Sequence, residues 1–122
     1  MRTRREVLGD EHVDRATDDA TEFTKEFQDF ITRYAWGEIW SRPGLDVRTR
    51  RVLVIGTLVA LGQWEELAMH VRAAIAAGDL SANDVKEIAL QQVIYCGVPA
   101  ANAAFRIVSE VVAEINSATR AR

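Results

Sequence analysis

The stretch QWEELAMHVRAAIAAG, residues 63–78, decides the fold class of this chain. Its largest apolar side chains recur every three or four residues, which is the period of one face of a helix. They are Trp64, Leu67, Val71 and Ile75. Gly78 ends the pattern, as glycine often does just after a helix. The stretch therefore predicts an amphipathic α-helix over Gln63–Ala77.

More apolar side chains flank this stripe, so the apolar surface is wider than one small bundle hides. They are Ala68, Met69, Ala73, Ala76 and Ala77. Alanine lets a neighbouring helix approach closely, and we expect this helix to be buried on more than one side. Surplus apolar surface of this kind predicts a homo-oligomer.

The segment before this stretch predicts a turn and a second helix. Ser41–Asp46 contains Pro43 and Gly44 and reads as a turn, after which Asp46 can cap a helix that ends at Gly62. The interior of that helix, residues 52–61, is almost wholly apolar, and its β-branched residues leave a strand possible. Its length and the lack of a hairpin partner favour a helix buried on most sides.

Two helices are predicted after the opening stretch. Ser81 and Asp84 have the spacing of a capping box, which opens a helix that runs to about Cys96. Gly97 closes that helix, and Pro99 suits the first turn of the last one. The last helix carries an apolar stripe of Ala100, Ala104, Ile107, Val108, Val111 and Ile115.

The N-terminal third predicts two short helices and a long one. Arg2–Leu8 is closed by Gly9, Asp10 can cap a helix that reaches Ala16, and Thr21 can cap a helix that runs to Trp40. Gly37 weakens the last turn of the long helix. The long helix is indicated by helical spacing of Phe23, Phe27, Phe30, Ile31 and Tyr34. The chain is thus predicted to be an all-α helical bundle with one domain, residues 1–122.

Composition narrows the function. The net charge is −3, with 15 basic and 18 acidic residues, which disfavours nucleic-acid binding because phosphate contacts need a concentrated basic surface. The charged first ten residues do not resemble a signal peptide, and no apolar run reaches the roughly 18 residues of a membrane span. We therefore expect a cytoplasmic protein without a membrane partner.

Neither the cysteine nor the basic residues predict a site by themselves. Cys96 is the one cysteine, which excludes an intrachain disulfide and a multi-cysteine metal site. No metal motif is built on histidine either. The basic clusters are expected to be solvated faces and helix ends. They are Arg2, Arg4 and Arg5 near the start, and Arg48, Arg50 and Arg51 further on.

Three groups of residues could carry chemistry. Glu66 and His70 are four residues apart, so they share a helix face at the edge of the apolar stripe, where carboxylate and imidazole can tune each other. The alternative is an ordinary surface pair. The second group, Arg33, Trp36, Trp40 and Arg42, could wall a pocket for a planar anion, because arginine grips carboxylates bidentately. Its tryptophans could equally be core or interface residues.

The third group flanks the boundary between the last two predicted helices. It contains Tyr95, Cys96 and Asn102, beside Gly97 and Pro99. A helix start offers free backbone N–H groups that can hold an anion or oxyanion. The alternative is the ordinary chemistry of a helix hairpin.

Three segments resemble the γ-carboxymuconolactone decarboxylase family, within the alkyl hydroperoxidase D-like superfamily. They are RYAWGEIWSRPGLD (33–46), LVALGQWEELAMH (58–70) and YCGVPAANAAF (95–105), in the family's order and spacing. The resemblance implies an all-α fold, a ring-like homo-oligomer that is usually a hexamer, and a place in the protocatechuate branch of the β-ketoadipate pathway. The implied reaction is the cofactor-free decarboxylation of 4-carboxymuconolactone, a small dicarboxylate lactone, to the 3-oxoadipate enol-lactone.

The resemblance also bears on the catalytic residues. Hydroperoxidase-like relatives carry a C-x-x-C-x-x-x-H stretch, and here Gln63 and Glu66 stand at the cysteine positions while His70 keeps the histidine. The missing cysteines disfavour a redox protein of the hydroperoxidase-like kind, and the polar cluster between Arg33 and Arg42 disfavours a non-catalytic oligomeric relative. The resemblance makes Glu66 and His70 the catalytic candidates, with no metal or cofactor. The expected substrate-binding residues are Arg33, Arg42, Trp36, Trp40 and Tyr95.

Overall fold

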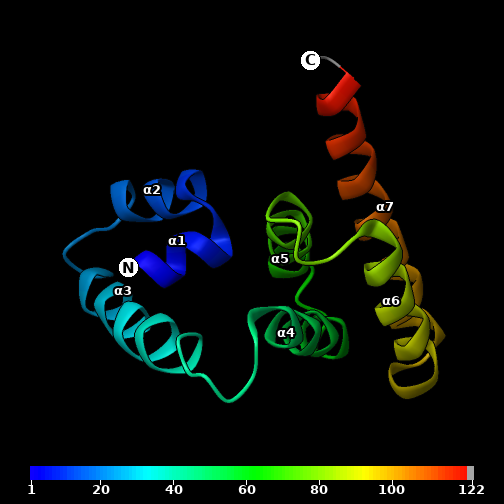
Figure 1. The fold of residues 1–122 in the computed structure, drawn as a ribbon, viewed down its shortest axis with the longest axis horizontal. Helices are drawn as coiled ribbons and strands as arrows, with labels where there is room; N and C mark the ends of the chain where they lie inside the picture. The colour runs from blue at the N-terminus through cyan, green and yellow to red at the C-terminus, as the bar shows by residue number, and fades with distance from the viewer. Residues whose placement is uncertain (121–122) are drawn as a thin grey trace. The chain divides into compact units, whose positions relative to one another are not determined.

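A computed structural model describes residues 1–120, which contain helices and no strand (Figure 1). The all-α prediction is therefore confirmed for this part of the chain. The helices group into two compact units, one of residues 1–47 and one that starts at Arg48.

The first unit contains α1 (Arg2–Leu8), α2 (Asp10–Asp18), α3 (Lys25–Ile31) and the π-helix η1 (Thr32–Ile39). Gly9 joins α1 to α2 with a φ of +89°, a left-handed value that glycine adopts without strain. The buried apolar side chains of this unit are Val7, Leu8, Val13 and Trp36. The prediction of Arg2–Leu8 is confirmed, whereas α2 ends two residues beyond the predicted Ala16 and is preceded by Gly9, not Asp10, as its cap.

The predicted long helix from Thr21 to Trp40 is wrong in its start and in its type. Thr21 begins a turn, in which its hydroxyl accepts a hydrogen bond from the Thr24 N–H at 3.2 Å, and the α-helix follows one turn later. After seven α-helical residues the chain continues as a π-helix. The aromatic residues that indicated the helix do not form a core: Phe23, Phe27, Phe30 and Tyr34 are exposed.

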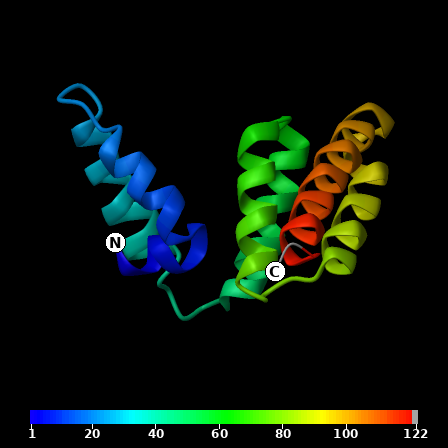
Figure 2. The same cartoon turned by 90° about the horizontal axis from the view of Figure 1, so that it is seen from above.

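The second unit contains α4 (Val47–Leu61), α5 (Trp64–Ala76), α6 (Ala82–Cys96) and α7 (Val98–Arg120). Helices α5 and α6 both pack along α7, and α6 and α7 run side by side in opposite directions (Figure 2). One apolar cluster fills this unit. Its buried members are Ile55, Val59, Leu67, Val71, Ala74, Leu80, Val85, Ala104, Val108 and Val111.

Local signals set the boundaries of these helices. The capping box predicted at α6 is present: the Ser81 hydroxyl accepts from the Asp84 N–H at 3.0 Å, and the Asp84 carboxylate accepts from the Ser81 N–H at 2.9 Å. Gln63 is the cap of α5, not its first residue. Burial of α4 on most sides is not observed within the chain, because Leu53 and Leu61 are exposed.

Two of the arginines expected in solvated clusters are buried. Arg51 is 1% exposed, and its Nε donates to a carboxylate oxygen of Asp79 at 2.8 Å. Arg4 is 6% exposed. The expectation was wrong because Arg4 lies one turn before Val7 and Leu8, and Arg51 one turn before Ile55. Each arginine therefore shares the buried face of its helix.

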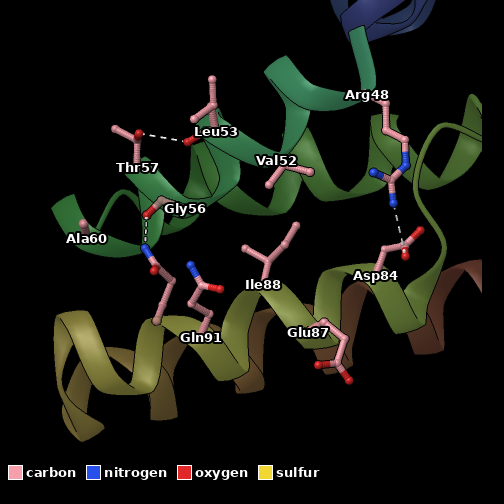
Figure 3. A pocket seen from close by; sticks show the side chains of 11 residues that line it. Arg48, Val52, Leu53, Gly56, Thr57, Ala60, Asp84, Glu87, Ile88 and Gln91 are labelled. Atoms are coloured by element: carbon pink, nitrogen blue, oxygen red, sulfur yellow. Dashed lines mark hydrogen bonds and ion pairs between the residues drawn. The ribbon is translucent and has the colours of Figure 1, made fainter. Parts of the chain in front are cut away.

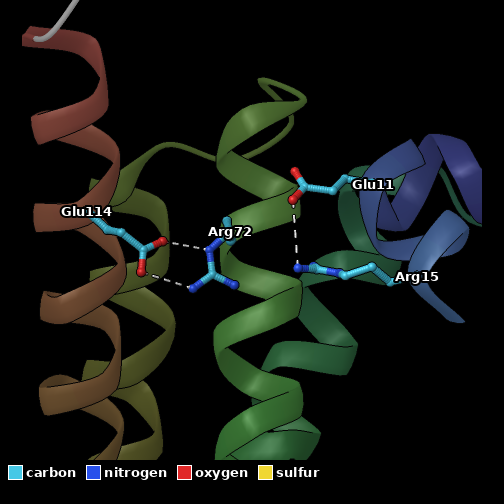
Figure 4. Close-up of polar contacts among 4 residues, drawn as sticks. All are labelled: Glu11, Arg15, Arg72 and Glu114. Carbon is cyan, nitrogen blue, oxygen red and sulfur yellow. Dashed lines mark hydrogen bonds and ion pairs between the residues drawn. The ribbon is translucent and has the colours of Figure 1, made fainter. Parts of the chain in front are cut away.

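An exposed ion pair joins α5 to α7. Both ends of the Arg72 guanidinium reach Glu114, from Nε to Oε2 at 2.8 Å and from Nη2 to Oε1 at 3.3 Å (Figure 4). Figure 4 also shows a pair within α2, where Arg15 and Glu11 are 3.7 Å apart. Hydrogen bonds from Arg72 lower the pKa of Glu114 below its ordinary value of 4.5.

We predict that Glu114→Gln flattens the acid side of the pH–stability curve. Because the folded pKa of Glu114 is lowered, its contribution is fully present above pH 4.5 and is lost as the pH falls through the folded value. Urea unfolding at a series of pH values below 4.5 measures this. Glu110→Gln is the control, because its pair with Arg106 at 3.6 Å lies within α7. A Glu114→Gln curve with the wild-type slope would contradict the prediction.

Candidate active site

Helix α5 carries Glu66 and His70 in two different environments. Glu66 lies in the first turn, where the positive end of the helix dipole favours a carboxylate, and its side chain is exposed. His70 lies one turn later and is only 8% exposed, beside the fully buried Leu67 and Val71. The predicted acid and imidazole thus lie one turn apart, with the carboxylate facing water and the imidazole inside.

The π-helix η1 places two tryptophans against each other. The rings of Trp36 and Trp40 stack with centroids 5.4 Å apart and planes 28° apart. Trp36 is buried, and its carbonyl accepts a 2.7 Å hydrogen bond from the Ser41 hydroxyl, which lies 2.7 Å from that of Thr3. The structure brings the two predicted tryptophans together as one aromatic wall.

The two predicted arginines flank this wall in sequence and are both exposed. The Arg33 guanidinium lies 5.6 Å from the centroid of the Tyr34 ring. Nη1 of Arg42 lies 3.7 Å from a carboxylate oxygen of Glu38. Contacts of exposed arginines contribute little to the free energy of folding and exchange with solvent. Either guanidinium therefore remains accessible to a carboxylate.

Tyr95 lies in the last turn of α6, and its side chain is 79% exposed. Its large neighbours Ile94 and Val98 are also exposed. A hydroxyl in water is a weaker oxyanion donor than one in a dry site. Tyr95 therefore requires a covering surface before it can serve the predicted role.

A cavity of about 550 Å³ lies between α4 and α6, and none of the predicted site residues lines it (Figure 3). The Gln92 side-chain amide crosses it to donate to the carbonyl of Gly56 at 2.9 Å. At one end Arg48 pairs with Asp84 at 3.4 Å, and Glu87 adds a second carboxylate. Two carboxylates against one guanidinium do not suit a dianion, so this cavity is not where we place the substrate.

Among residues 1–120, no group of three or more histidine, cysteine, aspartate or glutamate side chains is placed to hold a metal ion. Within the same range, every helix is too short or too polar to cross a lipid bilayer.

These features define an all-helical protein with a buried histidine one turn from a carboxylate, and comparison with known proteins gives the family. Residues 25–110 match the carboxymuconolactone decarboxylase family, and the chain belongs to that family. It is 43% identical to a 4-carboxymuconolactone decarboxylase of Acinetobacter baylyi over 97% of this chain and 87% of that protein. It is 40% identical to a nitrosuccinic acid decarboxylase of Metarhizium robertsii over 81% of this chain and 68% of that protein.

A shorter similarity points the same way. The chain is 53% identical to a 4-carboxymuconolactone decarboxylase of Pseudomonas putida over 31% of this chain and 79% of that sequence. The prediction of a decarboxylase of this family, made from the three segments and from His70, is confirmed at the level of the family and the reaction type.

Proposed function

We propose that this chain is a carbon–carbon lyase that decarboxylates 4-carboxymuconolactone to the 3-oxoadipate enol-lactone in protocatechuate catabolism. The observation that carries the proposal is 43% identity to a 4-carboxymuconolactone decarboxylase along 97% of the chain. The direct test is incubation of the purified protein with carboxymuconolactone while carbon dioxide release is followed. No release above the buffer rate would refute it.

The substrate itself explains why the residues need supply only binding and a proton. Its ring carbon next to the ring oxygen bears both the departing carboxylate and an acetate arm. When the carbon–carbon bond breaks, carbon dioxide leaves and the electron pair moves through the ring double bond into the lactone carbonyl. The product forms when a proton reaches the carbon beside that carbonyl. The ring accepts the electrons, so the proposed mechanism uses no cofactor.

We assign substrate binding to the arginines and the tryptophan stack. An arginine on the departing carboxylate would stabilise the ground state more than the transition state, so Arg42 or Arg33 is placed on the acetate arm. The departing carboxylate then faces the wall of Trp36 and Trp40, where loss of charge is favourable. Arg33 shares its hollow with Glu26 and Asp29, and this arrangement favours Arg42.

We assign the proton to His70, because imidazole changes its protonation state near neutral pH and this one is shielded from water. Glu66 is assigned the orienting role from its position one turn away. The Tyr95 hydroxyl, or the backbone N–H groups near Pro99, is proposed to meet the carbonyl oxygen as negative charge develops there.

Similarity to the nitrosuccinic acid decarboxylase supports a second candidate substrate. A nitro group on the carbon that loses its carboxylate accepts the electron pair as the lactone carbonyl does. Both compounds are dicarboxylates, so one arginine could hold the remaining carboxylate in either case. Comparing kcat/KM for the two compounds with the same preparation separates these candidates.

We also propose that the protein works in the cytoplasm as a ring-like homo-oligomer, a hexamer, with residues 1–122 as one domain. The matched region, 25–110, extends across both compact units and supports a single domain. Large apolar side chains that the second unit leaves exposed support association. They are Leu53, Leu61, Leu90, Ile94, Tyr95 and Val98.

We predict that light scattering at micromolar concentration reports about six times the 13.6 kDa mass of the chain. Burial of the exposed apolar side chains drives this association, because each such side chain favours removal from water. Ile94→Glu is expected to lower the mass. A wild-type mass of 13.6 kDa would contradict the prediction.

We predict that His70→Gln lowers kcat by about 10²–10⁴-fold, the usual effect of removing a general acid, and that the fold is kept. The kcat of the wild-type protein should change with pH near neutrality, and this change should be absent in His70→Gln. The chain has two histidines, so His12→Gln is the matched control and should keep the wild-type rate. Loss of activity in the control with normal turnover in His70→Gln would transfer the role to His12.

We predict that Arg42→Lys raises KM at least tenfold with a smaller effect on kcat, because lysine keeps the charge but loses the two-pronged contact with a carboxylate. Arg33→Lys is the paired variant and should have the smaller effect. Steady-state kinetics of both variants measures this. An unchanged KM in both would refute the assignment of these arginines to the acetate arm.

A further inference from the structure

Arg4 is a buried cation without a carboxylate. Its guanidinium donates from Nη2 to the side-chain oxygen of Gln28 at 3.1 Å and from Nη1 to the hydroxyl of Thr32 at 3.4 Å. Both partners are neutral. Its Nε is buried and has no hydrogen-bond partner among residues 1–120, and no carboxylate of those residues lies within ion-pair distance of it.

Other arginines that are next to Arg4 in the sequence, or at least as buried, are paired with carboxylates. Arg5, the next residue, lies 3.1 Å from Asp10 and 2.9 Å from Asp14. Arg51 is even more buried and is matched by Asp79. Buried charges in proteins are normally paired, because an unpaired charge inside is costly. Burial lowers the pKa of Arg4, yet a guanidinium stays charged in proteins.

Arg4 lines a cavity of about 340 Å³ that lies wholly within the first unit. Side chains from the end of α2, the following turn and α3 complete the wall. Its polar side chains other than carboxylates are Arg4, Thr17, Thr21, Lys25, Gln28 and Thr32. The volume is that of a site for a small organic molecule.

The charges of the wall narrow the chemical class of the ligand. Arg4 and Lys25 are cationic, and Glu22 and Asp29 are acidic side chains in the same wall. Two carboxylates disfavour a densely charged anion such as phosphate. A single planar carboxylate matches the guanidinium fork and brings only the charge that Arg4 lacks.

We propose that this cavity is a binding site for a small organic carboxylate, with its carboxylate on Arg4 and its other polar groups toward the threonine hydroxyls. The site is separate from Arg33 and Arg42, which the proposed substrate site uses. Because Arg4 belongs to α1 while Gln28 and Thr32 belong to α3 and η1, a ligand held here joins the two ends of the first unit. Binding should therefore stabilise that unit.

Thermal unfolding with lactate, which has one carboxylate and one hydroxyl, as the probe tests this. The midpoint should rise with lactate concentration and saturate, as expected for a ligand that binds the folded state. Sodium chloride and sodium phosphate at matched ionic strength should not reproduce the rise. An equal rise with either salt would overturn the proposal, because it would show general screening or an unselective anion site.

Three variants locate the effect. Arg4→Met should abolish the lactate-dependent rise. Arg2→Met is the matched control on the same helix, because its side chain is 92% exposed, and it should keep the rise. Gln28→Glu places a carboxylate where the amide oxygen now accepts from Arg4. It should raise the midpoint without lactate and weaken lactate binding at least tenfold by calorimetry, so the proposal remains testable if Arg4→Met fails to fold.

The following results would contradict the proposed site. A rise that persists in Arg4→Met, or full lactate affinity in Gln28→Glu, would overturn the site. A rise that Arg42→Lys abolishes and Gln28→Glu leaves intact would place the lactate on the proposed substrate arginine and overturn the site as well. Since none of these measurements uses turnover, they stand whether or not the proposed decarboxylation is found.

Discussion

The seam between α5 and α7 is the contact on which the second unit depends. Leu67, Val71 and Ala74 of α5 are fully buried there, as is Ala104 of α7, and the alanines let the two helices approach closely. A helix packed this tightly has one rotation about its axis that keeps its apolar stripe inside. That rotation buries the imidazole of His70 beside the stripe and leaves the carboxylate of Glu66 in water. The environment of the proposed proton donor is therefore a by-product of core packing.

The sequence predicts this unit well because its signals are local. Gly62, Gly78 and Gly97 mark helix ends with positive φ, and Ser81 forms its capping box with a residue three positions away. The first unit is predicted less well. The segment Thr32–Ile39 is a π-helix with Trp36 buried in it, and the helical spacing of the sequence does not distinguish π from α hydrogen bonding. Arg4 was misjudged from its charge, although its spacing to Val7 and Leu8 carried the correct signal.

The candidate site was predicted as residue types and only partly as an arrangement. Spacing on one helix correctly placed Glu66 and His70 one turn apart, and the stack of Trp36 on Trp40 followed from residues four apart. The tertiary surroundings of Tyr95 could not be read in this way, because exposure depends on which helices cover it. The two named decarboxylases also show why substrate choice resists sequence reasoning, because proteins similar to this chain are named for different compounds.

The π-helix η1 has a consequence for the evolution of this chain. A π turn is what an α-helix becomes when it takes in one extra residue. At η1 the segment therefore holds an extra residue. Losing a single residue between Thr32 and Ile39 would restore ordinary α bonding and turn everything after it by about 100° around the axis. The helix itself would gain, while every residue after the deletion would change its direction relative to α3. Insertions and deletions in this segment should therefore be rarer among working relatives than substitutions.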